Sequence, residues 1–186
     1  MNILFQVCGL IIIIFLFIIY KTQKNLHLFT DRVFTINLIN AICTLSFDAL
    51  SVVAIFYKDK LPIVLVNTAC KAYLISMICS GFCALFYVLV GVVKEKTRMK
   101  AFRISMGIIA AQSLAIALTP IEIVSENGLI YTQGISVYLC YGFTLIYIAL
   151  TIIAAVGFLF KKNSRRAVAV LVWMGFWCIA AIIQLI

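Results

Sequence analysis

Six long apolar runs divide this sequence and constrain its fold more than any other feature. They cover residues 3–20, 33–57, 61–93, 104–121, 135–160 and 167–186. A helix that crosses the hydrocarbon core of a bilayer needs about 20 apolar residues. With 66% hydrophobic and only 11% charged residues, the chain also lacks the charge that a soluble surface requires. We therefore expect an all-α fold, a single polytopic bundle of six transmembrane helices over residues 1–186.

The positive charges predict how this bundle is oriented. Twelve of the 15 Lys and Arg residues lie in the loops after the first, third and fifth runs, whereas Lys58 and Lys60 are alone in the opposite loops. The positive-inside rule places the basic loops in the cytoplasm and the N-terminus outside. The same placement favours the lipid bilayer as the partner and argues against nucleic acid, because no basic segment is interleaved with exposed aromatic residues.

This topology has a consequence for the last apolar run. With six spans, residues 184–186 reach the outer side and are still apolar. We therefore expect the chain to be truncated before a seventh span, which would return to the cytoplasm and lead to an output domain.

Two charged residues fall deep within the second and third runs. Asp48 precedes the turn at residues 58–60 by ten residues, and Lys71 follows it by eleven. At 1.5 Å per residue both lie about 15 Å from the turn, so the antiparallel hairpin places them at matched depth. An isolated charge at mid-membrane costs about 2.5–3.5 kcal/mol to insert, so we expect the two to pair. If they do, Asp48→Asn and Lys71→Met should each destabilise the fold more than the double change.

Polar side chains on the same two helices extend this site. Asn37, Thr44, Asp48 and Ser51 are spaced by seven, four and three residues, which predicts one polar face and a hydrated seam. The remaining polar residues on these helices are Asn40, Asn67 and Thr68. Two interpretations stay open, a structural ion pair that fixes helix register and a site for a polar ligand, an ion or a proton.

A β-hairpin is expected between the fourth and fifth spans. Pro120 ends the fourth run, and the β-prone segments 121–124 and 129–132 flank Asn127-Gly128. Asn-Gly is the strongest short-range signal for a hairpin turn, because both residues tolerate positive φ. On the extracellular side this hairpin is either a lid that contacts ligand or an ordinary connector. Its candidate contact residues are Glu122, Glu126, Tyr131 and Gln133.

No motif in the sequence indicates catalysis. There is no Gly-rich phosphate loop, no HExxH and no GxSxG elbow. The seven cysteines form no CxxC pair, and the single His27 lies in a basic loop. We expect no catalytic residue, no metal site and no cofactor, and hence a chain that is not itself an enzyme.

A family is suggested by short motifs throughout the chain, at residues 30–34, 47–51, 70–74, 119–122, 130–134, 165–167 and 173–174. In these segments the sequence resembles the N-terminal membrane region of clostridial and other bacterial GGDEF-type diguanylate cyclases, a region similar to the seven-span sensor region of some histidine kinases. The resemblance implies a sensor in a bacterial plasma membrane that controls a cytoplasmic domain making cyclic di-GMP, although the chain itself has no GGDEF-like motif and six predicted spans.

Two functions from different classes are consistent with these features. The first is a sensory or ligand-binding domain, in which an unidentified extracellular or membrane ligand enters between the hairpin and spans two to five. The rival is a small transporter or proton-coupled carrier that uses Asp48 and Lys71. No inverted repeat supports the carrier. Self-association as a homodimer is left open.

Overall fold

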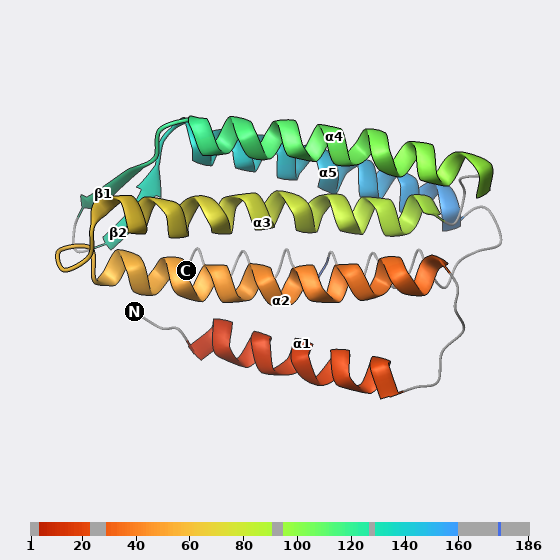
Figure 1. Ribbon diagram of the computed structural model, residues 1–186, viewed down its shortest axis with the longest axis horizontal. Coiled ribbons are helices and arrows are strands. Elements are labelled where there is room, and N and C mark those ends of the chain that lie inside the picture. The colour runs from red at the N-terminus through yellow and green to blue at the C-terminus, as the bar shows by residue number, and fades with distance from the viewer. Residues whose placement is uncertain (1–3, 23–28, 91–94, 127–128, 160–174, 176–186) are drawn as a thin grey trace.

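The computed structural model describes residues 4–22, 29–90, 95–126 and 129–159, together with Gly175. Within these ranges the chain forms five helices and one two-stranded sheet, and the helices alternate in direction (Figure 1). The elements are α1 (Leu4–Thr22), α2 (Phe29–Phe56), α3 (Ile63–Val90), α4 (Glu95–Leu118), β1 (Glu122–Glu126), β2 (Leu129–Gln133) and α5 (Ile135–Leu159).

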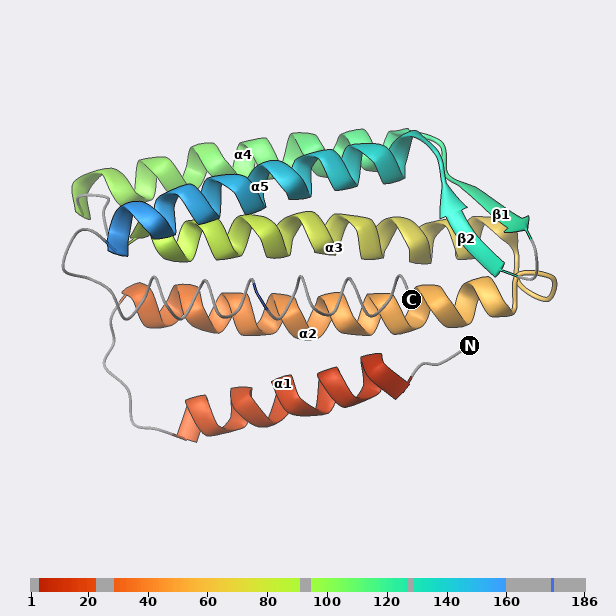
Figure 2. The same cartoon turned by 180° about the vertical axis from the view of Figure 1, so that it is seen from behind.

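Helix α3 is the centre of the bundle. It packs against α2 on one side and against α4 and α5 on the other, and α1 packs on the outer side of α2 (Figures 1 and 2). The order across the bundle is therefore α1, α2, α3 and then the α4–α5 pair. A site that involves α1 and a site that involves α4 must lie on opposite sides of the α2–α3 pair.

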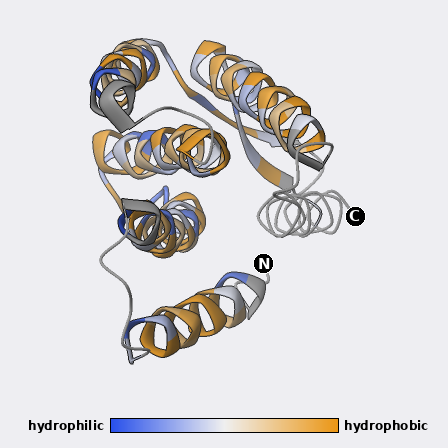
Figure 3. Ribbon diagram, turned by 90° about the vertical axis from the view of Figure 1, so that its right-hand side faces the viewer, coloured by the Kyte–Doolittle hydropathy of each residue, from blue (hydrophilic) through white to orange (hydrophobic). Residues whose placement is uncertain are grey.

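The outward surfaces of the helices are apolar. Leu118, Val64 and Ile153 expose 75%, 72% and 68% of their side-chain surface, and Figure 3 shows apolar residues around the helices. Four helical segments are long and apolar enough to cross a membrane, and α1 contributes a shorter apolar helix, Gln6–Thr22. The four segments are Arg32–Phe56, Ile63–Val90, Lys100–Leu118 and Ile135–Gly157. The mostly helical fold is thus confirmed, and four of its helices have the length and apolar composition of membrane spans. The count of six spans stays a prediction, since the run 167–186 falls outside the described residues except for Gly175.

Helix boundaries differ from the apolar runs where charge or proline intervenes. Helix α4 starts at Glu95, nine residues before the run that begins at residue 104, because charged residues such as Glu and Lys are good helix formers outside a membrane. Helix α3 begins at Ile63, directly after Pro62, whose fixed φ suits the start of a helix.

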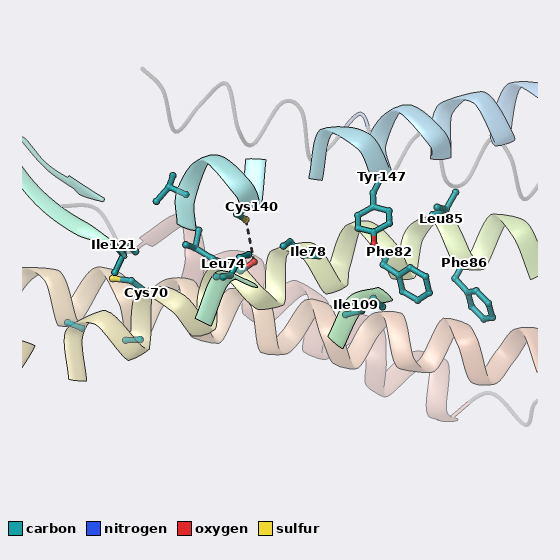
Figure 4. Close-up of a cluster of buried hydrophobic side chains, with 14 of the residues drawn as sticks. Cys70, Leu74, Ile78, Phe82, Leu85, Phe86, Ile109, Ile121, Cys140 and Tyr147 are labelled. Atoms are coloured by element: carbon teal, nitrogen blue, oxygen red, sulfur yellow. Dashed lines mark hydrogen bonds between the residues drawn. The ribbon is translucent and has the colours of Figure 1, made fainter. Parts of the chain in front are cut away.

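The buried core follows one stripe of α3. Cys70, Leu74, Ile78 and Phe82 recur every four residues and are all buried (Figure 4). Tyr147 of α5 packs on Phe82 with ring centroids 6.0 Å apart. These contacts hold α5 against the inner face of α3, with the thiol of Cys140 on the carbonyl oxygen of Leu74 at 3.4 Å.

The predicted hairpin is present between α4 and α5. β1 and β2 are antiparallel, and the register runs from Glu122 opposite Gln133 to Glu126 opposite Leu129. This register leaves a two-residue connection, which is the length that the Asn-Gly signal predicts. Asn127 and Gly128 themselves lie outside the described residues. From the end of α4 the hairpin extends toward the α2–α3 turn (Figures 1 and 2).

Two residues fix the hairpin to the helices. Gly134 has φ 124°, and a Cβ there would lie 3.0 Å from the carbonyl oxygen of Pro120. Ser136 is fully buried, and its hydroxyl lies 3.2, 2.8 and 3.1 Å from the carbonyl oxygens of Ile116, Thr119 and Pro120. The last carbonyls of a helix have no partner within that helix. Ser136 therefore caps the end of α4 from the start of α5.

Candidate intramembrane polar site

The Asp48 side chain is buried at the contact between α1, α2 and α3. Asp48 lies eight residues before the end of α2, which is about 12 Å along the helix axis. Its side chain is 9% exposed, and its side-chain hydrogen-bond partner is Gln6 in the first turn of α1. Gln6 is itself only 8% exposed. A carboxyl group and an amide from two helices thus meet inside the apolar bundle.

The third helix brings a tyrosine to this site. Tyr73 of α3 lies within electrostatic range of Asp48. Ser76 and Ser80 follow at spacings of three and four, so all three residues share the face of α3 that contacts α2. The site is therefore continuous with a polar strip on α3.

A hydrogen-bonded seam joins α2 to that strip. The Thr44 hydroxyl lies 3.2 Å from the carbonyl oxygen of Ser76 and 2.9 Å from Oγ of Ser80. Asn40 donates from Nδ2 to the same Ser80 hydroxyl at 2.6 Å. Such hydrogen bonds between helices contribute about 0.6–2 kcal/mol in membrane proteins. A polar seam therefore joins α2 to α3 through Asn40, Thr44 and two serines, and of these only Thr44 belongs to the predicted polar face. Hydration of this seam stays a prediction.

The predicted polar face of α2 is only partly buried. Thr44, Asp48 and Ser51 are all buried, whereas Asn37 is half-buried. The Ser51 hydroxyl donates to the carbonyl oxygen of Asp48 in its own helix at 2.8 Å. Ser51 therefore lines the buried face without linking two helices.

Lys71 does not pair with Asp48 in the structure. Its Nζ donates to the carbonyl oxygen of Ala117 in the last turn of α4 at 2.7 Å. Depth along the hairpin was therefore insufficient to predict the pairing, because direction around the helix also matters. Lys71 is two residues before Tyr73, so it points about 200° away from the face that meets Asp48.

Asn67 also lies apart from the seam. It precedes Lys71 by four residues and so occupies nearly the same side of α3, about 40° away. Its Oδ1 is buried and has no hydrogen-bond partner. Thr68 is exposed and bonds the carbonyl oxygen of Val64 in its own helix at 2.7 Å. Neither residue contributes to the Asp48 site.

The candidate contact residues of the hairpin are on its surface. Glu122, Tyr131 and Gln133 are exposed, and Gln133 donates to the Tyr138 hydroxyl of α5 at 3.1 Å. Glu126 ends β1, but its side chain lies outside the described part. Whether this surface contacts a ligand stays a prediction.

Sequence reasoning missed Gln6, Tyr73, Ser76 and Ser80. Gln6 had a usable signal, because it is the one amide side chain in the apolar run 3–20. Ser76 and Ser80 had the i, i+4 spacing of a helix face. Tyr73 had no such signal, since tyrosines are also common in apolar packing positions.

The site can hold a small cation more readily than a transition metal. Among the described residues there is no group of three or more His, Cys, Asp or Glu side chains. The Asp48 carboxyl instead has the neutral neighbours Gln6 and Tyr73, and it forms no ion pair with any residue in the described part of the chain. A buried carboxylate in that setting requires a proton, a cation or further hydrogen bonds.

Comparison with known proteins adds no assignment. No protein-family model matches the chain, and no curated protein or solved structure matches it either. The geometry around Asp48 is thus the main guide to function.

Proposed function

We propose that this chain is a membrane-embedded sensory domain, in which the α1–α2–α3 site around Asp48 binds a ligand and changes the packing of the helices. One observation carries the proposal, namely a carboxyl group buried among three helices whose described partners are all neutral. Ionisable residues inside a membrane are by default functional candidates. Lys71, by contrast, has a structural explanation as a cap of α4.

The site is suited to switching because it joins separate helices. A ligand shifts an equilibrium between two arrangements only if it binds one of them better. Any change in the charge of Asp48 alters its interaction with Gln6 on α1 and with Tyr73 on α3. A local event at Asp48 would therefore bias how α1 and α3 pack on α2.

The resemblance to membrane regions of diguanylate cyclases suggests the output. In this proposal the helices pass the signal to a cytoplasmic domain that makes cyclic di-GMP. The end of α1 and the starts of α2 and α4 lie at the end of the bundle remote from the hairpin (Figure 1). These segments contain the basic residues Lys21, Arg32, Lys100 and Arg103, and the positive-inside rule would place the cytoplasm there.

The test measures cyclic di-GMP in cells that carry the native gene. Asp48→Asn keeps the shape of the side chain and removes its charge, so we expect it to lock the cyclic di-GMP level at one value while the wild type responds to growth conditions. Asp59→Asn is the matched control, because Asp59 is exposed in the α2–α3 turn. A cyclic di-GMP level that is the same in all three strains under every condition would contradict the proposed output.

A carrier is the rival function, because a carboxyl without a cationic partner also suits a coupling-ion site. Proton or Na⁺ flux through reconstituted wild-type protein, lost in Asp48→Asn and kept in Asp59→Asn, would favour the carrier. If the chain is a sensory domain, proton and Na⁺ flux into proteoliposomes should equal the flux into liposomes without protein.

A further inference from the structure

Two oxygen-bearing groups at the α1–α2 contact are buried without adequate partners. The Asp48 carboxyl is 9% exposed and has no cationic partner among the described residues. The Gln6 amide that bonds it is 8% exposed, and its Oε1 is buried with no hydrogen-bond partner. A buried acceptor left without a hydrogen bond loses the solvation that it had in water, which destabilises the fold. Both groups would be satisfied by a positively charged or donating species.

The chemistry of the two groups defines what that species is. An amide can donate through its nitrogen to a carboxylate, or accept through its oxygen from a carboxylic acid, and the two orientations differ by a flip of the amide. A proton on Asp48 would therefore satisfy Oε1 of Gln6. Na⁺ would do the same, because hard cations prefer carboxylate and carbonyl oxygens.

The described neighbours supply no alternative charge. Tyr73 is the titratable group that faces Asp48 from α3, and it is neutral in its protonated form. Lys71 of α3 points to α4, and the nearest described cation of α1, Lys21, lies fifteen residues along the helix from Gln6. Among the residues that the structure describes, none near Asp48 therefore supplies a positive charge.

We propose that Asp48 and Gln6 form a binding site for a monovalent cation, H⁺ or Na⁺, and that its occupancy controls how the outer end of α1 docks on α2. This inference rests on the proposed sensory role of the same site and names its ligand. At its other end α1 is held by the ring contact of Tyr20 with Phe34, with centroids 4.7 Å apart. Loss of the cation leaves an uncompensated charge buried beside Gln6, which favours opening of that end of α1 to water, while the Tyr20 end stays in place.

The experiment is infrared spectroscopy of the purified full chain in phosphatidylcholine nanodiscs, titrated with pH in choline chloride or in NaCl. The wild type minus Asp48→Asn spectrum isolates the stretching band of the protonated Asp48 carboxyl. We expect this band to appear as pH falls and to persist in Asp59→Asn. Asp48→Glu, which keeps a carboxyl, serves if Asp48→Asn does not fold.

The choice of salt in the titration distinguishes binding of Na⁺ from binding of H⁺ alone. If Na⁺ competes for the site, each tenfold increase in NaCl above its Kd lowers the pH midpoint of the band by about one unit, as competitive linkage requires. If only H⁺ binds, NaCl and choline chloride give the same midpoint. Gln6→Met should shift the midpoint, whereas Gln112→Met, which breaks the Tyr147–Gln112 hydrogen bond between α4 and α5, should not.

Two results would overturn the inference. One is a wild-type spectrum identical to that of Asp48→Asn at every pH, and the other is a midpoint that Gln6→Met leaves unchanged. The infrared measurement needs no output domain, so it tests cation binding separately from signalling. Cation binding can be absent while Asp48→Asn still changes the cyclic di-GMP level, and it can be present while Asp48→Asn leaves that level unchanged.

Discussion

At the scale of the residue, Asp48 and Lys71 are accommodated in the apolar bundle by different means. Lys71 donates to Ala117 in the last turn of α4, where the helix dipole favours a cation. Asp48 contacts the amide of Gln6 and has no opposite charge. The lysine is therefore satisfied by the fold itself, whereas the aspartate needs a partner that the described chain does not supply.

A double-mutant cycle tests this separation. Because Asp48 and Lys71 share no partner, Asp48→Asn and Lys71→Met should add to within about 0.3–0.5 kcal/mol in the free energy of unfolding. Asp48→Asn and Gln6→Met should instead couple by about 0.5–3 kcal/mol, because these residues touch. The measurement is unfolding of the purified chain in mixed micelles by circular dichroism. Coupling of comparable size between Asp48→Asn and Lys71→Met would show that Asp48 and Lys71 form a direct ion pair.

The depths of both charges could be predicted from the sequence, because a short turn between two helices fixes depth by counting residues. The partners could not. Lys71 and Tyr73 differ by two residues and face opposite sides of α3, and no residue count shows which side α1 or α4 covers. Gln6 became visible as part of the site only when α1 was placed beside α2.

At the scale of the element, the end of α4, the hairpin and the start of α5 form one hydrogen-bonded unit. The Thr119 hydroxyl donates to the carbonyl oxygen of Ala115 at 2.9 Å, and Lys71 donates to the carbonyl oxygen of Ala117. The Ser136 hydroxyl lies within hydrogen-bond distance of the carbonyl oxygens of Ile116, Thr119 and Pro120. The hairpin itself was predictable from Asn-Gly between β-prone segments. Its attachment through Ser136 was not, because a serine at a helix start has many alternative partners.

Gly134→Ala tests how strictly this junction is shaped. The new Cβ would lie 3.0 Å from a backbone oxygen at φ 124°, so we expect a loss of about 1–3 kcal/mol in the free energy of unfolding. Gly142→Ala is the matched control, because nothing lies within 4 Å of a Cβ there and alanine favours the helix. The comparison uses unfolding midpoints in the same micelles. Equal midpoints for the two variants would show that the junction tolerates a side chain.

At the scale of the whole molecule, the two ends of the bundle differ in charge. The hairpin and the α2–α3 turn, which carries Lys58, Asp59 and Lys60, are at one end (Figure 1). At the other end are the end of α1 and the starts of α2 and α4, which contain the described basic residues Lys21, Arg32, Lys100 and Arg103. An alternating helix order made this separation predictable from the loops alone. The orientation in the membrane follows from the positive-inside rule and stays a prediction.

Cysteine labelling in intact cells tests the orientation. Glu122→Cys places a thiol on the exposed hairpin and Lys100→Cys places one at the opposite end. A membrane-impermeant maleimide should label Glu122→Cys in intact cells and Lys100→Cys only after the membrane is opened. Native cysteines are accounted for by labelling the unaltered chain. The reverse pattern would place the N-terminus in the cytoplasm.

The bond from Lys71 to Ala117 has a consequence for biogenesis, because its two residues are 46 positions apart in the chain. At about 5–20 residues per second, the ribosome needs roughly 2–9 seconds after Lys71 before Ala117 is even synthesised. Asp48 meets the opposite situation, since Gln6 is made first. During that interval the α2–α3 pair carries an uncapped ammonium group, so it must stay beside the translocon, near lipid headgroups or water, until α4 arrives.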